Sequence, residues 1–574
     1  MKKLTLALST VAVACAVHQA HAFCGFYVAG GDQQMFNDAT QVVLMRKGTR
    51  TVLAMQNNYK GPPQDFAMVI TVPTVLHEGD VKTLPLGVFE HVEQMGAPRL
   101  VEYWEQDPCN QMKNEERSRK SLAPPSAQHA MAGAPKADDL GVTIEAQFVV
   151  GEYNIQILSA KDSTGLDTWL KQQKYKIPDG AEPLLRPYVE GGSKFFVAKV
   201  DPTKVKFDAN QRAALSPLRF FYDTDRFELP IRLGLANSSG TQDLIVNILA
   251  PHQRYEVANY PNVTIPTNLD VRESVKDKFG AFYAALFDRT VEKHPGSVVT
   301  EYAWQATTCD PCPGPALGPA DFQLLGADVL DQKSDQPDDG FAAKQQAAAD
   351  AMQKLQKAQR DRVAPEELRK LSQEYVRLRQ LVPYRNPYSY GMDFVLTRLH
   401  ARYGKDIKDD LVFKAADPIV GGREHVIDPQ TGKLEEGAQK DASNNFQGRY
   451  AIRHEWTGPV TCEHPVRRIW GGPPSEVTSR AGFQYTGIKP ATGLAFAPRG
   501  EVALPQVVTR DLPEIDVKMA APPAGATPPT PQTPQTPATA QPKSTGCGCQ
   551  SSGPASGGLL FGVLALALRR RRRR

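Results

Sequence analysis

Five cysteines are distributed between residues 24 and 462, and their thiols could form disulfides or bind a metal ion. They are Cys24, Cys109, Cys309, Cys312 and Cys462. Cysteines of proteins in oxidising compartments usually pair, so an odd number leaves one over or bound to something else. We predict that Cys24 pairs with Cys109. We further predict that Cys309 and Cys312 pair with each other, or that one of them pairs with Cys462.

Cys309-Asp310-Pro311-Cys312 has the C-x-x-C spacing that redox dithiols, zinc sites and short disulfides share. A redox dithiol places its first cysteine at the start of a helix, but Pro313-Gly314-Pro315 follows here and disfavours a helix. We therefore expect a structural disulfide, with a redox pair and a zinc site as alternatives. The zinc ligands would be Cys309, Cys312, Cys462 and His464. Apart from that zinc, we predict no cofactor.

The histidines do not complete a known catalytic motif. His77-Glu78 and His454-Glu455 both lack the second histidine that a zinc protease helix carries four residues after the first. We find no nucleophile elbow and no glycine-rich phosphate loop either. We assign no catalytic residue and predict a non-catalytic binding, adhesion or structural module. The alternative is an extracellular hydrolytic or metal-dependent enzyme whose site is assembled from distant residues.

The N-terminus has the three parts of a secretory signal peptide. Lys2 and Lys3 precede an apolar stretch, and Ala20-His21-Ala22 supplies the small residues of a cleavage site. We predict a signal peptide over residues 1–22, which a signal peptidase removes after Ala22. The chain is therefore expected to be exported to the cell envelope.

The C-terminus predicts a spacer followed by a membrane tail. Residues 505–546 are rich in Pro, Thr, Ala and Gln, a composition that cannot form a core, so we predict a disordered linker there. Residues 547–574 contain Cys547-Gly548-Cys549, the apolar run Gly557–Leu568 and six arginines. That run gives about 18 Å of helix against a bilayer core of about 30 Å, which is a marginal single span. The arginines would stay cytoplasmic.

This order of Cys-Gly-Cys, short apolar span and arginine cluster resembles the MYXO-CTERM sorting tail of myxobacteria and related Gram-negative bacteria. The resemblance implies cleavage by an intramembrane sorting protease. It also implies that Cys547 or Cys549 carries or permits a lipid, and that the mature protein lies at the outer surface. An uncleaved tail anchor is the alternative.

Composition restricts the partners of the exported part. The chain has 574 residues, 41% of them hydrophobic and 23% charged, which is typical of a globular protein. Its formal net charge of +4 becomes −4 once Lys2, Lys3 and the six terminal arginines are set aside. A mildly acidic body argues against nucleic-acid binding. The partners we expect are the membrane, the two processing proteases and an unidentified envelope or extracellular ligand.

Alternating apolar residues predict a β-rich N-terminal region, residues 23–340. One hairpin joins Val42–Met45 to Thr51–Met55 through Gly48, and another joins Val142–Val150 to Tyr153–Leu158. Further strands are predicted at Phe66–Val72, Phe195–Val200 and Asp243–Leu249. Between them, Asn110–Gly141 is polar and rich in proline and alanine, so we predict a long surface loop.

Two of these strands share an internal similarity. Asp65 precedes Pro73 by the same spacing as Asp243 precedes Pro251, and each segment follows an asparagine-bearing strand and a turn. One explanation is a duplicated strand–turn–strand unit in a sandwich-like domain. The other is two unrelated hairpins with the same turn residues.

The following region, residues 341–504, is interpreted as a helical segment and then strands that continue the same body. One predicted helix, Ser274–Glu292, precedes this region, and the others cover Gly340–Arg362, Pro365 to about Pro383, and Asp393–Gly404. Strands and turns return from Phe413 to about Ala503. The expected fold class is α+β, with a β-rich, sandwich-like N-terminal region, a helical segment, the linker and the membrane tail.

Several short motifs resemble one bacterial family, called domain of unknown function 2330. They are Phe23–Val28, Asn37–Val42, Tyr103-Trp104-Glu105, Asp107-Pro108-Cys109, Glu301–Trp304, Cys309–Cys312, Leu396–Tyr403 and Ile419–Glu424. The resemblance covers most of residues 23 to about 430. It implies no activity, substrate or catalytic residue.

Overall fold

The computed structural model describes residues 26–28, 36–60, 67–109, 142–173, 175, 180–207, 213–237, 241–330, 341–361, 363–381, 393–404, 406–423, 435–473 and 497–521. They lie in a unit that ends at Ala520, except for Ala521, the first residue of a second unit. The signal peptide, the 110–141 loop, Cys24, Cys547 and Cys549 lie outside the described residues.

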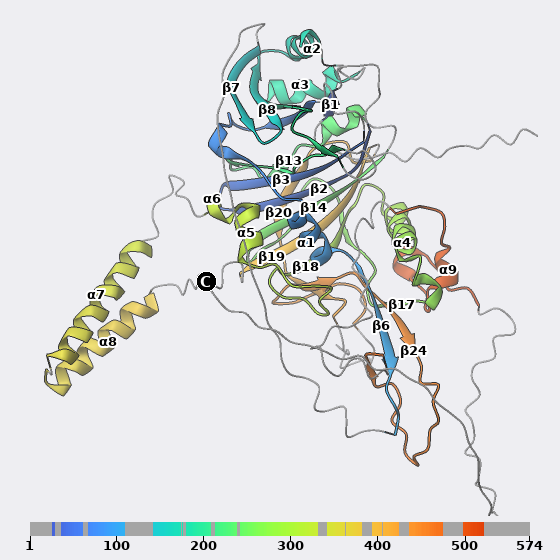
Figure 1. Cartoon of the computed structure of the whole chain (residues 1–574). Helices are drawn as coiled ribbons and strands as arrows, with labels where there is room; N and C mark the ends of the chain where they lie inside the picture. The colour runs from blue at the N-terminus through green and yellow to red at the C-terminus, as the bar shows by residue number, and fades with distance from the viewer. Residues whose placement is uncertain are drawn as a thin grey trace, which may run out of the picture. The chain divides into compact units, whose positions relative to one another are not determined.

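The largest sheet crosses the middle of the molecule (Figure 1). Its central strands are β2 (Phe36–Lys47), β3 (Arg50–Lys60), β14 (Gln242–Pro251), β18 (Val298–Gln305) and β19 (Phe394–Tyr403). Towards its edges lie β5 (Val81–Thr83), β12 (Leu218–Asp223), β16 (Asn262–Thr264), β21 (Ile419–Gly421), β22 (Gln439–Lys440) and β23 (Asn445–Gln447). The hairpin of β2 and β3 confirms the first predicted hairpin, and Gly48 takes the positive φ of +59° that its turn needs.

A five-stranded sheet packs against one face of the large sheet. Its strands, in order, are β1 (Phe26–Val28), β4 (Ala67–Val72), β9 (Lys194–Val200), β8 (Tyr153–Ala160) and β7 (Val142–Val150). Side chains of both sheets, such as Ile70 and Phe196 from one and Val246 and Leu399 from the other, form a single buried cluster. This confirms the sandwich-like, β-rich prediction and the predicted strands of this region.

Helices cover the two outer faces of the sandwich. The short sheet is covered by α2 (Ser163–Gln172) and α3 (Glu182–Glu190), which contribute Leu166 and Leu185 to a second cluster (Figure 1). The large sheet is covered by α1 (Gly87–Gly96), α5 (Pro319–Phe322), the π-turn η5 (Gln323–Ala327) and α6 (Asp328–Leu330). The order of layers is therefore helix, sheet, sheet, helix.

A third region is built around α4 (Phe279–Lys293). A four-stranded sheet packs on it, in the order β17 (Leu269–Asp270), β24 (Arg449–His454), β6 (Arg99–Glu105) and β25 (Trp470–Gly471). The segment after Ala503 packs there too, through α9 (Leu504–Val507) and η9 (Pro513–Ile515). Val508, Leu512, Ile515 and Val517 of this segment are buried. The linker predicted from residue 505 therefore begins too early, because four apolar residues among the prolines suffice to dock the segment.

The remaining described elements are small, apart from one helical pair. Helices α7 (Phe341–Arg360) and α8 (Pro365–Leu381) confirm two predicted helices and pack on each other. The short strands are β10 (Lys206–Phe207), β11 (Ala213–Ala214), β13 (Glu228–Leu229), β15 (Arg254–Val257) and β20 (Leu411–Ala416). The 3-10 turns are η1 (Glu78–Asp80), η3 (Arg232–Asn237) and η4 (Glu273–Val275).

Two predictions about elements are wrong. Residues 394–403 form the strand β19 and not a helix: charged residues recur at every second position from Arg398 to Arg402, and the strand pairs with β14 on one side and β18 on the other. Helix α4 begins at Phe279, since Glu273–Val275 forms a separate 3-10 turn. Of the two explanations for the internal similarity, the structure favours unrelated hairpins, because Asn237 lies in a 3-10 turn and not on a strand, and β4 and β14 lie in different sheets.

Candidate functional site

The structure pairs four of the predicted cysteines. Cys109 is bonded to Cys462, 353 residues away, and Cys309 is bonded to Cys312. The predicted Cys24–Cys109 pair is therefore wrong, because β6 and β24 lie side by side and bring the residues after them together. The disulfide predicted within Cys309–Cys312 is present.

The predicted zinc site is not assembled. Cys462 is bonded to Cys109, so its sulfur cannot also act as a thiolate ligand beside Cys309 and Cys312. His464 lies on an exposed loop next to Cys462. Among the described residues, no group of three or more His, Cys, Asp or Glu side chains is placed to hold a metal ion.

The Cys109–Cys462 disulfide holds the middle of an exposed loop, residues 455–469, which we call the Cys462 loop. This loop joins β24 to β25. Main-chain hydrogen bonds fix it as well: the Val466 N–H donates to the Pro108 carbonyl at 3.0 Å, and Gln106 donates to the Ile469 carbonyl at 2.8 Å. The loop is therefore attached to the end of β6 by a covalent bond and by main-chain pairing.

Glu105 is the second anchor of the Cys462 loop. Its buried carboxylate accepts hydrogen bonds from Nε and Nη2 of Arg467, at 2.9 and 2.8 Å. It also accepts hydrogen bonds from the main-chain N–H groups of Trp456 and Arg468, at 2.9 and 2.6 Å. Burial raises the pKa of Glu105, but the hydrogen bonds from Arg467, Arg468 and Trp456 outweigh it and lower the pKa overall. Arg468 adopts a φ of +64°, which costs a non-glycine residue about 1 kcal/mol and which the contact with Glu105 holds in place.

The outer side of the Cys462 loop exposes apolar side chains. Val460 and Val466 are 43% and 42% exposed, and they are two of the four large hydrophobic side chains that are exposed in the described part of the chain. The Trp456 indole folds over Gly458, where a Cβ would be 2.5 Å from the ring. The loop thus combines exposed valines and a half-buried tryptophan on a fixed backbone.

The strands beneath the loop carry aromatic side chains on both faces. On one face, Trp104 stacks on His454 with ring centroids 4.7 Å apart. On the other face, the Arg453 guanidinium lies 5.6 Å from the Tyr103 ring and 5.0 Å from the Trp470 ring. Three of the chain's five tryptophans therefore lie on or next to the Cys462 loop: Trp104, Trp456 and Trp470.

A second group of ionisable side chains lies buried under α1 and α4. Glu301 on β18 accepts hydrogen bonds from Arg398 at 2.6 Å and from Tyr283, and its other neighbour is His400 at 2.6 Å. Arg398 also pairs with Glu93 on α1 at 2.5 Å. The Glu301, Arg398 and His400 side chains have no solvent exposure. We call these residues, with those of the next paragraph, the buried ionic network.

The network continues from His400 to the surface. Asp243 on β14 lies 3.5 Å from His400, 2.9 Å from Arg402 and 2.5 Å from Arg499. Asp288 on α4 pairs with both arginines, at 2.8 and 2.9 Å. The Phe287 ring stacks on the His400 imidazole at 3.5 Å, which excludes water from that side.

The charges of the network set its pKa values. Burial raises the pKa of Glu301, but His400 and Arg398 outweigh it and lower the pKa to about 2. Burial likewise raises the pKa of Asp243, but His400 and Arg402 outweigh this effect, so the pKa is lowered overall. Burial lowers the pKa of His400, but Glu301 and Asp243 outweigh that effect and raise it. Each of these charged groups thus has a neighbour of opposite charge, and none of them lines the cleft described below.

Comparison with known proteins gives one match. Residues 18–414 match a family described as an uncharacterized protein conserved in bacteria, DUF2330. The chain belongs to this family. No curated protein and no solved structure matches the chain.

Two of the motifs that resembled the DUF2330 family meet in the buried ionic network. Glu301 comes from the motif Glu301–Trp304, and Arg398, His400 and Arg402 come from Leu396–Tyr403. Both motifs lie within the residues that match DUF2330, whereas the Cys462 loop lies beyond them. Sequence reasoning missed the network because no local spacing connects β14, β18 and β19. The only sequence signal of the network was that charged residues occupy every second position in β19. In a strand, such residues point to the same face of the sheet.

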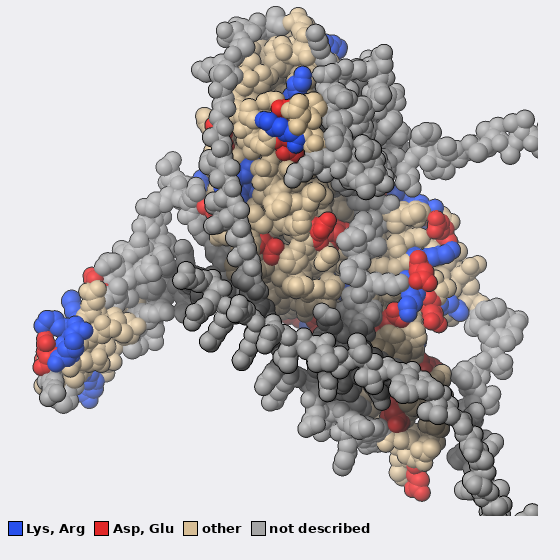
Figure 2. Space-filling model, viewed as in Figure 1, with Lys and Arg blue, Asp and Glu red and all other residues tan. Residues whose placement is uncertain are grey.

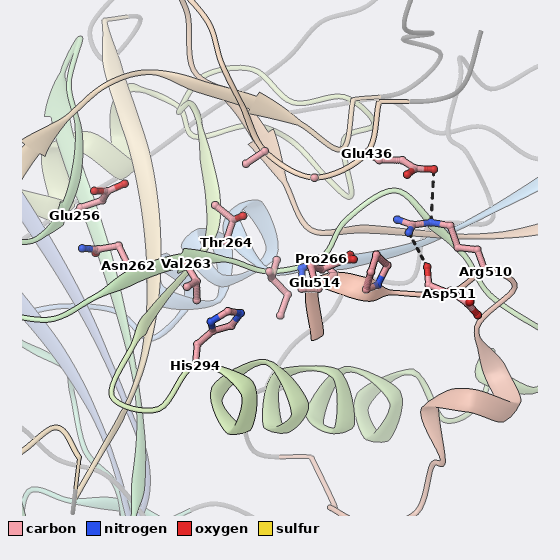
Figure 3. Close-up of a pocket in the computed structure, with 14 residues that line it drawn as sticks. Glu256, Asn262, Val263, Thr264, Pro266, His294, Glu436, Arg510, Asp511 and Glu514 are labelled. Atoms are coloured by element: carbon pink, nitrogen blue, oxygen red, sulfur yellow. Dashed lines mark hydrogen bonds and ion pairs between the residues drawn. The ribbon is translucent and has the colours of Figure 1, made fainter. Parts of the chain in front are cut away.

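A cleft lies in the described unit, and Figure 3 shows the residues that line it. It has a volume of about 780 Å³ and lies between β16, the end of α4 at His294, the segment 436–438 and the segment 510–514. Polar side chains that line the cleft bond to neighbouring residues: Arg510 pairs with Glu436 at 3.7 Å, and Asn262 donates to the Val257 carbonyl at 2.8 Å. We see no nucleophile and base side by side among the residues that line it.

The surface around α4 carries charges of both signs next to each other (Figure 2). Lys293 pairs with Asp516 there, and Arg289 with Glu292 at 3.0 Å. Among the described residues, no helix combines the length and apolar character that a membrane span requires. The apolar run predicted as a span, residues 557–568, lies outside the described residues, as does Ala22.

Proposed function

We propose that this DUF2330 protein is a non-catalytic binding protein of the bacterial cell envelope, and that the Cys462 loop is its recognition element. The observation that carries the proposal is the fixed, partly apolar loop. Two independent anchors, the Cys109–Cys462 disulfide and the Glu105 carboxylate, hold it, while Val460 and Val466 stay exposed. A surface that is rigid before binding loses little entropy on binding, which favours affinity.

Export is the first part of the proposal. Its support is the leader and cleavage pattern at Ala22, together with a disulfide between residues far apart in the sequence. Such structural disulfides form and persist in oxidising compartments. The Cys547–Arg574 sequence supports a final location at the outer surface, with lipid on Cys547 or Cys549 and cleavage by a sorting protease.

The surface location can be tested on intact cells. A membrane-impermeant amine reagent should label the full chain on intact cells, whereas deletion of residues 547–574 should release the protein into the medium. Replacing both Cys547 and Cys549 by Ser should abolish any acyl mass on the mature protein. Labelling that requires broken cells would contradict the proposed location.

The partner that the Cys462 loop suits best is another protein. Tryptophan and arginine are the side chains most enriched in the energetically important parts of protein interfaces. The loop carries Trp456, Arg467 and Arg468, and its exposed aliphatic residues are branched valines. Tryptophan and arginine side chains together with exposed valines on a fixed loop are a composition that suits an interaction site.

Binding can be measured with the mature chain and envelope fragments of the bacterium that makes it. The wild type should bind saturably, and protease treatment of the fragments should remove that binding. The double variant Val460→Asp, Val466→Asp should bind at least about tenfold more weakly, because burial of one valine contributes about 1.5 kcal/mol and 1.4 kcal/mol corresponds to tenfold.

The matched controls are Leu86→Asp and Met519→Asp. These two residues are 39% and 37% exposed and lie outside the Cys462 loop, so both variants should bind as the wild type does. Equal binding by the double valine variant would refute the recognition role of the loop. Binding that survives protease treatment would refute a protein partner and favour a polysaccharide or lipid.

A further inference from the structure

The two disulfides differ in their surroundings and in the ring that they close. Cys312 is exposed, whereas Cys309 is half-buried and packs against the hydrophobic cluster beneath α1. Cys309 and Cys312 are three residues apart, so their bond restricts the unfolded chain far less than the bond between Cys109 and Cys462, 353 residues apart. Opening the short ring should therefore destabilise the fold much less than opening the long one.

The turn that carries the short disulfide is held by other contacts. The Arg99 guanidinium donates to the Pro311 carbonyl at 2.8 Å, and the Gln447 side-chain amide donates to the Asp310 carbonyl. Arg99 and Gln447 are both 1% exposed, so these hydrogen bonds are shielded from water. The turn is therefore expected to keep its place when the sulfur–sulfur bond is broken.

Arg99 also brings a buried positive charge to this turn. Its guanidinium donates to the carbonyls of Pro311 and Met95 and lies 5.5 Å from the Tyr302 ring. Asp310, in the same turn, is the acidic residue whose charge acts on this guanidinium. A buried cation also stabilises a second anion that forms nearby, such as a cysteine thiolate.

We infer that Cys309–Cys312 is a thiol–disulfide exchange site that reacts with dithiol reductants at the Cys312 sulfur. A thiolate of the reductant attacks Cys312 Sγ, forms a mixed disulfide and breaks the bond to Cys309, which leaves as a thiolate near Arg99. The second thiolate of the reductant then attacks the reductant's own sulfur and releases Cys312. Two electrons and two protons pass to the protein, and the reductant becomes a cyclic disulfide.

Graded reduction of the folded mature chain with dithiothreitol tests this inference. After alkylation and peptide mass mapping, Cys309 and Cys312 should become labelled at about tenfold lower dithiothreitol than Cys109 and Cys462. The circular dichroism spectrum should stay native at that point. If both disulfides open together, or if Cys109–Cys462 opens first, the inference is wrong.

Single variants then identify the reacting sulfur. Cys312 in the Cys309→Ser variant should form a mixed disulfide with oxidised glutathione at least about tenfold faster than Cys309 in Cys312→Ser. Equal rates would overturn the assignment to Cys312. These measurements do not involve the Cys462 loop, so they are independent of the proposed binding function.

The role of Arg99 is tested by the pH profile of alkylation. Arg99→Met should shift the rise in Cys309 alkylation rate to higher pH in the reduced protein, whereas Arg99→Lys should not. An unshifted profile in folded Arg99→Met would remove Arg99 from the site. If Arg99→Met does not fold, the two cysteine variants and the graded reduction still decide whether the exchange site exists.

Discussion

Glu301 is the residue on which most of the buried ionic network depends. Its carboxylate contacts Arg398, His400 and Tyr283. The side chains of Glu301, Arg398 and His400 have no solvent exposure, so water could not replace the carboxylate as their hydrogen-bond partner. Removing one partner of a buried ion pair leaves the other charge uncompensated, which costs more than the pair itself contributes.

Replacing Glu301 by Gln should therefore lower the free energy of unfolding by about 3–5 kcal/mol. Urea denaturation followed by circular dichroism would measure it. The matched control is Glu292→Gln, which removes the carboxylate of a surface pair with Arg289; its side chain is 68% exposed, so the change should stay below about 1 kcal/mol. Similar losses in the two variants would contradict a structural role for the network.

The network also predicts how stability changes with pH. Glu301 and Asp243 have lowered pKa values in the folded chain, so their contribution is present above their ordinary pKa values and is lost as pH falls towards 2. His400 has a raised pKa, so its contribution is complete below its ordinary pKa of 6.5 and is lost as pH rises through the raised value. The unfolding free energy should therefore be highest between about pH 5 and 6.5.

Denaturation at a series of pH values would give this profile for the wild type and for His400→Gln. The variant should lose the decrease on the alkaline side and keep the decrease on the acidic side, because only His400 is removed. A wild-type profile that is flat from pH 5 to 9 would mean that His400 is not charged in the folded protein.

At the scale of elements, the Cys462 loop depends on anchors that the sequence did not reveal. The double variant Cys109→Ser, Cys462→Ser should lose roughly 3–5 kcal/mol of stability, because it frees a very long ring in the unfolded state. In the folded variant, amide hydrogen exchange in residues 455–469 should rise while exchange in α4 stays slow. Uniformly faster exchange across both segments would show that the disulfide supports the whole fold and not the loop.

The segment 504–520 gives a second prediction at this scale. A chain that ends at Ala521 should be as stable as the longer one, whereas a chain that ends at Ala503 should lose at least about 3 kcal/mol, since Val508, Leu512, Ile515 and Val517 leave the cluster around α4. Thermal unfolding of the two truncated chains would measure the difference. Equal midpoints would place the end of the folded body before residue 504.

The elements that could be predicted from the sequence depend on local residues, whereas those that could not depend on contacts between distant residues. The hairpins β2–β3 and β7–β8 were predictable because their turns and alternating residues are local. Strand β19 was assigned as a helix although charged residues recur at every second position from Arg398 to Arg402, because these charges are buried by partners on β14 and β18, far away in the sequence. The pairing of Cys109 with Cys462 and the anchoring by Glu105 follow from β6 lying beside β24, a contact between residues far apart in the sequence.

At the scale of the whole molecule, the described unit combines a sandwich with a region around α4. The residues that match DUF2330 end at 414, yet β23 adds to the large sheet and β24 pairs with β6. The later part of the chain is thus integrated into the same fold and supplies the Cys462 loop. Cys109, within the matched residues, holds Cys462, beyond them.

The central claim is that the chain is exported and presents a loop that a long-range disulfide holds in place. Peptide mass mapping of the protein recovered from the native cell envelope tests it most directly. We predict an N-terminus at Phe23 and a peptide pair joined through Cys109 and Cys462. A chain that still begins at Met1, with Cys109 and Cys462 as free thiols, would contradict both the location and the proposed recognition element.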